Sequence, residues 1–546
     1  MKTARHGRTA AAFVGLLLGF CLHSTGTLHA ETAADAPAAS DEAQRLADRI
    51  DELIAARWAA DGITPAPISD DAEFYRRASL DLCGRTPPGS EVRDFIADNS
   101  PDKRRAAIDR MLSGPTYIVN ATNRWREAMI PEASAQQEAR FSLPGFESWL
   151  RSRIAENRNF AEIAREMLTL PIGGDSMAAF LQPTEPTPAA FYQAKQGKPE
   201  ELGAATSRLF LGVRLECAQC HDHPFDSWKR EQFWEYAAFF GDLQPMQPPE
   251  SLAEVVSIAL PDKRSLKIPE TDIVVTAGFL DGQRPNWNAG SAASTRDVLA
   301  EWITSRDNPW FARAAANRVW AQMFGIGLVE PLDDFSPNNP PSHPELLDDL
   351  ATAFADQGYD LRFLTRAIAL SQTYQRTSRR THDSQDDPRT FARVSVRAMS
   401  PEQIFDSLAQ ATGYLQPFDP EAPLDFNNDP ARQEFLETFA NDSESTIERQ
   451  STILQALTLM NGAYIAEATD IVRSRTLTAV VEAPFLDVSE KIEALFFAAL
   501  SRSPLPEELS KFREYVEAGG PTGDQQQALA DVYWAILNSS EFAVNH

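Results

Sequence analysis

Apolar residues recur every three to four positions along most of this chain, and this spacing constrains the fold more than any other feature. The stretch SEKIEALFFAAL places Ile492 and Leu495 on one face of a helix. In SPEQIFDSL, Ser400 is the expected N-cap and Gln403 completes a capping box. Similar patterns occur in SEVRDFIAD, PDKRRAAIDRML, DLRFLTRAIALS and QQALADVYWAILNSS. The chain is therefore predicted to be mainly α-helical.

The first thirty residues have the features of an export signal. A basic start precedes an apolar run from Ala10 to Leu22, which is shorter than the roughly 20 residues that span a bilayer. The small residue Ala30 then stands at the expected cleavage position. We predict a signal peptide over residues 1–30 and an exported protein that is periplasmic, cell-surface or secreted. No later stretch predicts an integral membrane segment.

The charge and the motifs of the chain narrow the classes of function. Its formal net charge of −27 repels phosphate backbones, so nucleic acid is not an expected partner. No phosphate-binding loop, nucleophile elbow or H-E-x-x-H motif occurs, so the sequence assigns no enzymatic class. The three cysteines after the signal are too few for a disulfide framework. Cys83 lies on an apolar helical stripe and is expected to be a small buried side chain.

The remaining chain divides by composition. Residues 31–44 are small and acidic, and they are predicted to be a disordered leader. Two helical domains are expected over residues 45–245 and 295–546, without an evident internal repeat. Between them, residues 246–294 combine a Pro-rich linker with the strand-like run SLKIPETDIVVTAGF, which predicts a small β-containing insert. The acidic, turn-rich residues 415–446 are expected to form a surface loop.

The stretch LECAQCHDHPFDSW contains the motif with the clearest chemistry. Cys217, Cys220 and His221 match the c-type haem attachment pattern. Thiols three positions apart lie on the same side of a helical turn, where they can add to the two vinyl groups of a haem. The following imidazole can then be an axial ligand of the iron. Attachment of haem outside the cytoplasm agrees with the predicted export, so we expect an electron-transfer or redox role.

Two other interpretations of this stretch stay open. The two thiols with His221, His223 and perhaps Asp226 could instead hold zinc or iron, because all are metal ligands in proteins. The cysteines could also form a structural disulfide in a cell-surface binding or scaffolding protein. Structural zinc sites more often join two separated ligand pairs, whereas these donors lie within a single short segment.

Two residues elsewhere are candidates for a second iron ligand. Met246 lies in the Pro-rich QPMQPP segment, where it is a possible thioether ligand or an ordinary linker residue. His343 is expected in the first helical turn after the N-cap Ser342, with Glu345 completing a capping box. There the helix dipole favours the neutral imidazole that binds metals.

Asp333 and Asp334 lie in a Pro- and Asn-rich loop near His343. These carboxylates could bind a cation or act in acid/base catalysis with the histidine, but adjacent residues rarely face one substrate, so a solvated loop is expected.

Five stretches, spread over almost the whole chain after the signal, carry a family resemblance. They are DDAEFYRRASLDLCGRTP, TSRLFLGVRLECAQCHDHPFDSWKREQFWEYAAFF, NPWFARAAANRVWAQMFGIGLVEPLDDFSPNNPPSHPELLDDLA, RAMSPEQIFDSL and WAILNSSEFAVNH. The chain resembles the exported planctomycetal cytochrome-c-like family of unknown function. In that family an N-terminal domain of the PSCyt type is joined to a C-terminal domain of the PSD type.

The resemblance implies site residues and a partner but no activity. The family's Cys-x-x-Cys-His falls on Cys217, Cys220 and His221, and its His-Pro-Phe-Asp falls on residues 223–226. Many relatives look as if they carry a further N-terminal cytochrome c domain, which this sequence does not show. The resemblance therefore implies that electrons would be exchanged with a separate redox partner protein.

Overall fold

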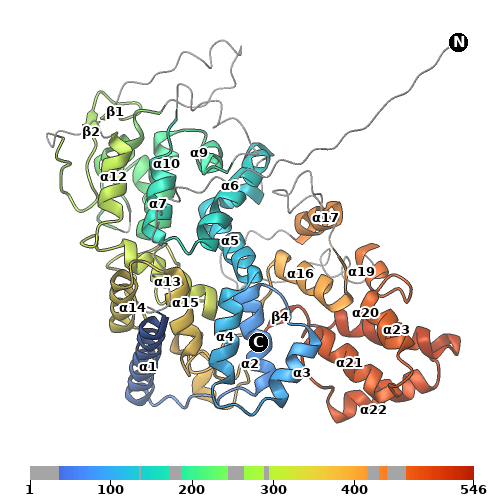
Figure 1. Ribbon diagram of the computed structural model, residues 1–546. Helices are drawn as coiled ribbons and strands as arrows, with labels where there is room; N and C mark the ends of the chain where they lie inside the picture. The colour runs from blue at the N-terminus through green and yellow to red at the C-terminus, as the bar shows by residue number, and fades with distance from the viewer. Residues whose placement is uncertain are drawn as a thin grey trace, which may run out of the picture. The chain divides into compact units, whose positions relative to one another are not determined.

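Helices make up most of the chain in the computed structural model, and the prediction of a mainly α fold is confirmed (Figure 1). The structure describes residues 36–134, 137–172, 186–224, 226–243, 264–287, 294–415, 429–439 and 463–546. Contacts divide the chain into a short unit, Met1–Asp41, and a large unit, Glu42–His546. The predicted signal peptide lies outside the described residues. Helix α1 begins at Ala36, within the leader for which composition predicts disorder.

Ten of the described α-helices precede the β-containing insert. They are α1 (Ala36–Asp61), α2 (Asp71–Ala78), α3 (Gly89–Ala97), α4 (Lys103–Ser113), α5 (Pro115–Met129), α6 (Gln137–Ala155), α7 (Phe160–Leu168), α9 (Ala189–Ala194), α10 (Pro199–Thr206) and α11 (Arg230–Ala237). The described α-helices that follow the insert are α12 (Thr295–Ile303), α13 (Phe311–Phe324), α14 (Pro344–Asp356), α15 (Leu361–Leu370), α16 (Pro401–Thr412), α17 (Pro430–Phe439), α19 (Ala463–Ala468), α20 (Arg475–Glu482), α21 (Val488–Leu500), α22 (Pro506–Glu517) and α23 (Gln525–Leu537).

Shorter helical turns connect these elements. Two are π-helical, η1 (Ser79–Cys83) and η3 (Ser207–Leu211). The described 3₁₀ turns are η2 (Pro131–Ser134), η4 (Glu216–Gln219), η5 (Ala238–Phe240), η6 (Asp383–Gln385), η7 (Pro388–Thr390) and η8 (Gly520–Thr522).

Local sequence signals place several helices correctly. The stretch SEKIEALFFAAL forms α21, and α16 begins with the predicted capping box. Ser400 Oγ accepts a hydrogen bond from the Gln403 backbone N–H (3.2 Å), and Gln403 Oε1 accepts one from the Ser400 N–H (3.0 Å). The prediction of a loop over 415–446 is wrong for α17. Its Phe435 and Phe439 stack with ring centroids 4.1 Å apart and are buried, so apolar burial offsets the acidic composition.

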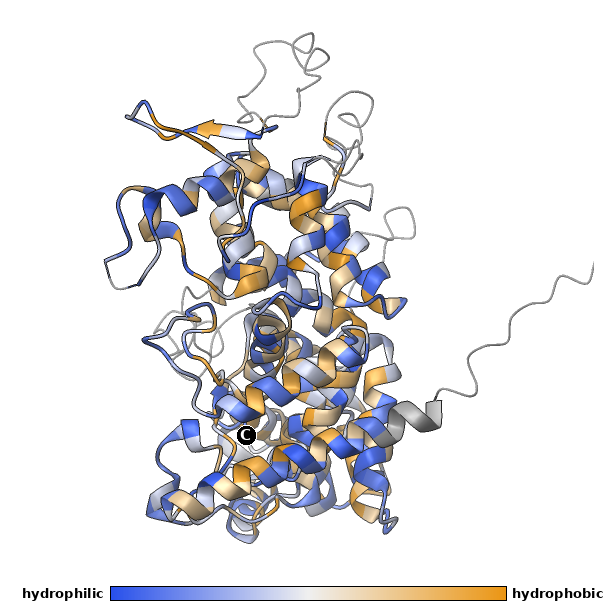
Figure 2. Cartoon of the chain, turned by 90° about the vertical axis from the view of Figure 1, so that its left-hand side faces the viewer, coloured by the Kyte–Doolittle hydropathy of each residue, from blue (hydrophilic) through white to orange (hydrophobic). Residues whose placement is uncertain are grey.

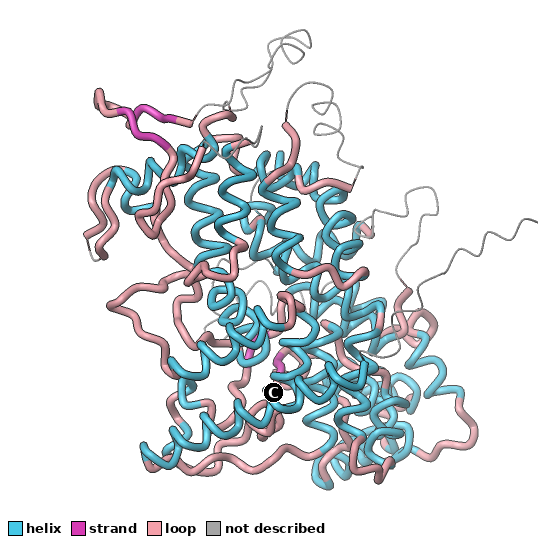
Figure 3. The backbone as a smooth tube through the Cα atoms, turned by 60° about the vertical axis from the view of Figure 1, so that its left-hand side comes forward, coloured by secondary structure: helices cyan, strands magenta, loops and turns pink. Residues whose placement is uncertain are grey.

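The predicted β insert is confirmed as an antiparallel hairpin of β1 (Ser265–Lys267) and β2 (Val274–Thr276), drawn as magenta strands in Figure 3. A second short sheet pairs β3 (Arg397–Ala398) with β4 (Val544–Asn545). This pair joins the residues before α16 to the last residues of the chain, and it lies beside the C-terminus in Figure 3.

The buried apolar residues form two clusters, and each draws on segments far apart in sequence. The first contains residues from Ala43 to Ala392 together with Phe497. The second contains Leu80 and residues between Met399 and Phe542. The helices are accordingly amphipathic, with hydrophobic and hydrophilic residues mixed along their length in Figure 2. The regions 45–245 and 295–392 therefore share one core.

Two helices end in the same unusual way. Helix α2 continues into the π-turn η1 and α10 into η3, and each turn stops at a glycine with positive φ, Gly84 (+74°) or Gly212 (+66°). Each π-turn begins with a serine, Ser79 or Ser207, whose hydroxyl donates to the carbonyl six residues later (2.8 and 3.0 Å). η1 packs on α5, and η3 packs on α13. The motif recurs although the sequence shows no evident repeat.

A buried carboxylate ties the beginning of the large unit to its end. Asp81 accepts hydrogen bonds from the Tyr374 hydroxyl (2.7 Å), the Arg397 guanidinium (2.9 and 3.0 Å) and the Asn545 amide (2.7 Å). The neighbouring Arg76, also buried, donates to backbone carbonyls of α21 and of the segment before β4 (3.0 and 3.2 Å). The buried Asp81 carboxylate is thus matched by Arg397 and by neutral donors, and removal of one partner would leave a buried charge uncompensated.

Candidate functional site

The Cys–His turn, residues 217–221, follows directly from the second π-helical motif. After Gly212 the chain passes through the buried Leu215 into the 3₁₀ turn η4. Within η4 the Ala218 side chain is buried and its N–H donates to the Leu215 carbonyl (2.8 Å). Cys217 and Cys220 are both exposed, free thiols. The buried alanine thus anchors the turn while the thiols face solvent.

The 3₁₀ turn and its cap hold the two thiols three positions apart. Cys217 lies within η4, and Cys220 is its C-cap residue. In a 3₁₀ turn, side chains at this spacing lie on the same side, so the geometry favours two thiols that face the same way. The Gln219 carbonyl between them accepts from Trp234 Nε1 (3.0 Å) and Arg230 Nε (3.3 Å) of α11. Arg230 also donates to a carbonyl at the tip of the β1–β2 hairpin (3.0 Å). Helix α11 and the hairpin therefore fix the end of the turn.

The imidazole of His221 is exposed and is oriented by its neighbour. Its Nδ1 lies 2.8 Å from the Asp222 carbonyl oxygen, which can only accept, so in this hydrogen bond Nδ1 is the donor. The Asp222 carboxylate in turn accepts from the Arg230 N–H and from Lys229 Nζ, each at 3.0 Å. These contacts, first the backbone hydrogen bond, lower the pKa of Asp222 below its usual value.

The other predicted metal ligands have separate surroundings. His223 is half-buried, and its backbone N–H donates to the Trp228 carbonyl (2.8 Å). The Asp226 carboxylate accepts from the N–H (2.6 Å) and the hydroxyl (3.3 Å) of Ser227. Met246 lies outside the described residues. Among the residues that the structure does describe, no three His, Cys, Asp or Glu side chains gather in a way that could hold a metal ion.

His343 lies at a different place in the core. Its ring is 7% exposed, and the ring centroid is 5.5 Å from that of Phe391. Its Nδ1 lies 3.1 Å from Ser342 Oγ, and Nε2 has no hydrogen-bond partner among the described atoms. Burial, and next the nearby Arg57 guanidinium, lower the pKa of His343 to about 4. The side chain is thus neutral at neutral pH, chiefly because of burial.

The predicted cap of α14 is wrong. His343 is itself the N-cap residue, and no side chain caps the helix. The Ser342 N–H donates to the Leu328 carbonyl (2.8 Å), which holds the serine one residue outside the helix. Glu345, expected in the capping box, forms an ion pair with Arg49 of α1 (2.5 Å). A tertiary contact therefore takes the place of the local one.

The prediction of a solvated loop is wrong for Asp333. The residue is buried, and its carboxylate pairs with Arg214, which lies just before the Cys–His turn (2.6 Å). No local pattern predicts this pair, because 119 positions separate the two residues.

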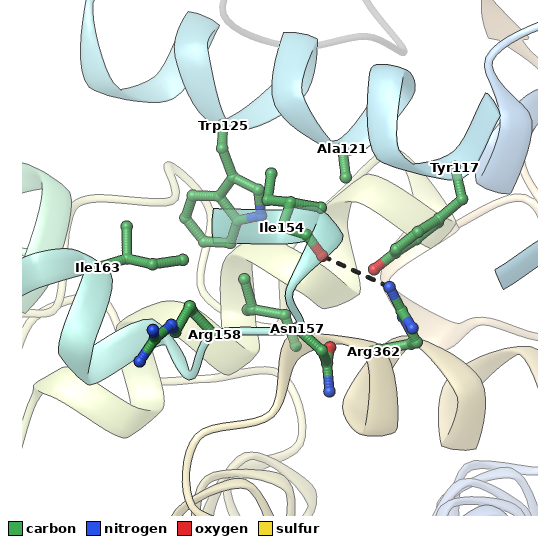
Figure 4. A pocket seen from close by; sticks show the side chains of 9 residues that line it. Tyr117, Ala121, Trp125, Ile154, Asn157, Arg158, Ile163 and Arg362 are labelled. Atoms are coloured by element: carbon green, nitrogen blue, oxygen red, sulfur yellow. Dashed lines mark hydrogen bonds between the residues drawn. The ribbon is translucent and has the colours of Figure 1, made fainter. Parts of the chain in front are cut away.

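A small pocket of about 20 Å³ opens between α5, α6, α7 and α15, and it is large enough for about one water molecule (Figure 4). Its polar lining includes Arg362, which donates to the Ile154 carbonyl (3.4 Å), and Asn157 in the exposed turn after α6. None of the predicted site residues lines this pocket.

The described residues fit a covalently attached haem. Attachment requires two accessible thiols on one side of a turn, followed by an imidazole with an available Nε2. Cys217 and Cys220 supply two exposed free thiols, and His221 supplies an exposed imidazole directly after them.

The fold and this site define a mainly α-helical protein with an exposed Cys-x-x-Cys-His turn. Residues 49–245 match the PSCyt2 family model, a protein of unknown function (DUF1549). Residues 295–516 match the PSD1 family model, a protein of unknown function (DUF1553). The chain belongs to the planctomycetal two-domain family of unknown function that joins these two regions, as its sequence predicts.

No curated protein and no solved structure matches the chain. In the part of the chain that the structure describes, no helix has both the length and the apolar composition needed to cross a membrane.

Proposed function

We propose that this protein is exported and binds one haem covalently at the Cys–His turn, where it serves in electron transfer or another redox reaction. The observation that carries the proposal is the exposure of the free thiols of Cys217 and Cys220 at η4 and its C-cap, directly before an imidazole that contacts a backbone carbonyl. The signal-like residues 1–30 support export to a compartment in which haem is attached.

The chain's own residues would have distinct tasks. Each thiol adds across one vinyl double bond: the sulfur forms a C–S bond, the thiol hydrogen goes to the second carbon, and no oxidant is consumed. His221 would bind the iron through Nε2, because its Nδ1 proton is held by the Asp222 carbonyl. A bound haem supplies a one-electron couple whose potential depends on axial ligation and solvent exposure. A separate redox protein would be the electron partner.

The test uses the full chain exported from a host with haem-attachment machinery. We expect haem to stay with the denatured chain on a gel stained for haem, and a pyridine haemochrome spectrum typical of two thioether bonds. A colourless chain would overturn the proposal. Elemental analysis of such a chain then distinguishes the alternatives: bound zinc or iron favours a metal site of Cys217, Cys220, His221 and His223. A metal-free chain favours the binding or scaffolding role.

A further inference from the structure

The segment that leads into the Cys–His turn rests on a loop of the PSD1 region, residues 329–336. The Phe335 backbone N–H donates to the Gly212 carbonyl (2.9 Å). At Gly212, where φ is +66°, a Cβ atom would lie only 2.5 Å from the Phe335 ring. Close approach and positive φ both require glycine here, so the loop and the segment fit tightly.

Ion pairs extend this contact toward the thiols. Asp333 Oδ1 accepts from Arg214 Nε at 2.6 Å, and its other oxygen lies 3.8 Å from Arg208 Nε. Arg208 also lies 3.5 Å from Glu216, the residue before Cys217. The Asp333 side chain is only 10% exposed, whereas the two arginines are about one-third exposed. Asp333 and Glu216 together therefore balance the two arginines that precede the turn, and Asp333 makes the shorter contact, to Arg214.

We propose that Asp333 is a positioning residue for the Cys–His turn, through which the PSD1 region holds the segment that carries the thiols. This inference deepens the proposed function, because it takes the turn as the site of haem attachment. It assigns a task to the second family region: fixing the segment from which the two thiols extend.

Loss of the carboxylate removes the ion pair that holds Arg214, so the segment before η4 loosens and the effective concentration of one thiol near the other falls. This loosening disfavours a disulfide between Cys217 and Cys220 relative to the dithiol. A substitution that only destabilises the protein at a distance would not shift this equilibrium.

The experiment compares Asp333→Asn with the adjacent Asp334→Asn as the matched control, in the haem-free full chain. The probe is glutathione: its disulfide oxidises the two thiols to a protein disulfide and is reduced to two glutathione molecules. We expect the equilibrium constant for disulfide formation to fall at least fivefold in Asp333→Asn. Asp334→Asn is expected to stay within twofold of the original chain.

Hydrogen exchange provides the second readout. Amides of residues 207–220 are expected to exchange about tenfold faster in Asp333→Asn and to be unchanged in Asp334→Asn, while α21 keeps its protection in both. If Asp333→Asn does not fold, Arg214→Gln tests the same ion pair from its half-exposed side and should give the same shifts.

An unchanged thiol equilibrium, with or without faster exchange, would overturn the positioning role. The haem proposal can fail separately. If the original chain is colourless but Asp333→Asn still lowers the equilibrium constant fivefold, Asp333 positions the thiol pair and no haem is attached there.

Discussion

Single buried charged side chains carry the largest energetic consequences in this protein, because an ion taken from water must be matched by partners. Asp81 has no exposed side-chain surface and is satisfied by Tyr374, Arg397 and Asn545. Burial, and next the neighbouring Asp81 carboxylate, raise the pKa of Tyr374 well above its usual value. Each group depends on the others remaining in place.

Asp81→Asn should destabilise the protein by about 3–5 kcal/mol, since it leaves the buried Arg397 without its counter-charge. Urea unfolding followed by circular dichroism measures the change. Asp348→Asn is the control, because Asp348 pairs with Arg313 at the surface, where such pairs contribute at most about 1 kcal/mol. Equal effects of the two substitutions would contradict the role given to burial.

His343 predicts a specific dependence of stability on pH. Its pKa is lowered to about 4 in the folded chain, below the value of about 6.5 expected when unfolded. Protonation therefore favours unfolding. The contribution of neutral His343 to the free energy of unfolding is fully present above pH 6.5. As the pH falls from 6.5 to 4, the free energy of unfolding decreases by up to about 3 kcal/mol. In His343→Gln this part of the dependence should vanish, as measured by urea midpoints across that range. If the urea midpoints of His343→Gln fall with pH as steeply as those of the original chain, His343 is not the group responsible.

At the scale of elements, the π-turns determine where the following segments go. η3 ends at Gly212 and directs the chain toward η4, just as η1 ends at Gly84 and directs the chain past α5. π-turns within helices are rare and occur often at functional sites. The one before the Cys–His turn thus joins a helix packed on the core to an exposed motif.

Gly212→Ala should cost about 1–3 kcal/mol more than Gly282→Ala in urea unfolding. Both glycines have positive φ, so both alanines have the same left-handed penalty of about 1–2 kcal/mol. Only at Gly212 would the new methyl group meet Phe335, whereas Gly282 has open space around it. Similar losses at the two sites would show that the Phe335 contact is not tight.

The elements that sequence predicts well are those that depend on neighbours within one or two turns. The capping box of Ser400 and Gln403 and the apolar face of α21 are of this kind. Prediction from sequence is wrong where a partner far along the chain determines the contacts of a side chain. Asp333 pairs with Arg214, and Glu345 pairs with Arg49 and does not form the expected cap. The Cys-x-x-Cys-His motif could be recognised from sequence, because its two thiols and its imidazole lie within five consecutive residues.

At the scale of the whole chain, the two family regions depend on each other. The first apolar cluster contains residues of both 49–245 and 295–392, and Leu80 lies in the second cluster with α16, α21 and α23. Composition predicts a domain boundary at the β insert, because a Pro-rich linker can be recognised from local sequence. The shared core could not be predicted in this way, since it depends on packing between residues far apart in the chain.

A fragment of residues 45–245 should therefore not unfold cooperatively, because its apolar face toward α13 and α15 would be exposed to water. Urea titration followed by tryptophan fluorescence, with the full chain as the reference, checks this. A cooperative transition of the fragment near the midpoint of the full chain would show that the region folds alone.

The central claim concerns two thiols, and peptide mass spectrometry of the exported chain tests it most directly. Trypsin cuts after Arg214 and Lys229, so one peptide contains both Cys217 and Cys220. Haem attachment at Cys217 and Cys220 predicts that this peptide has gained the mass of one haem. The gain should disappear in a Cys217→Ser/Cys220→Ser variant and stay unchanged in Cys83→Ser. A peptide of unmodified mass, from a host that attaches haem to other proteins, would show that these thiols do not bind haem.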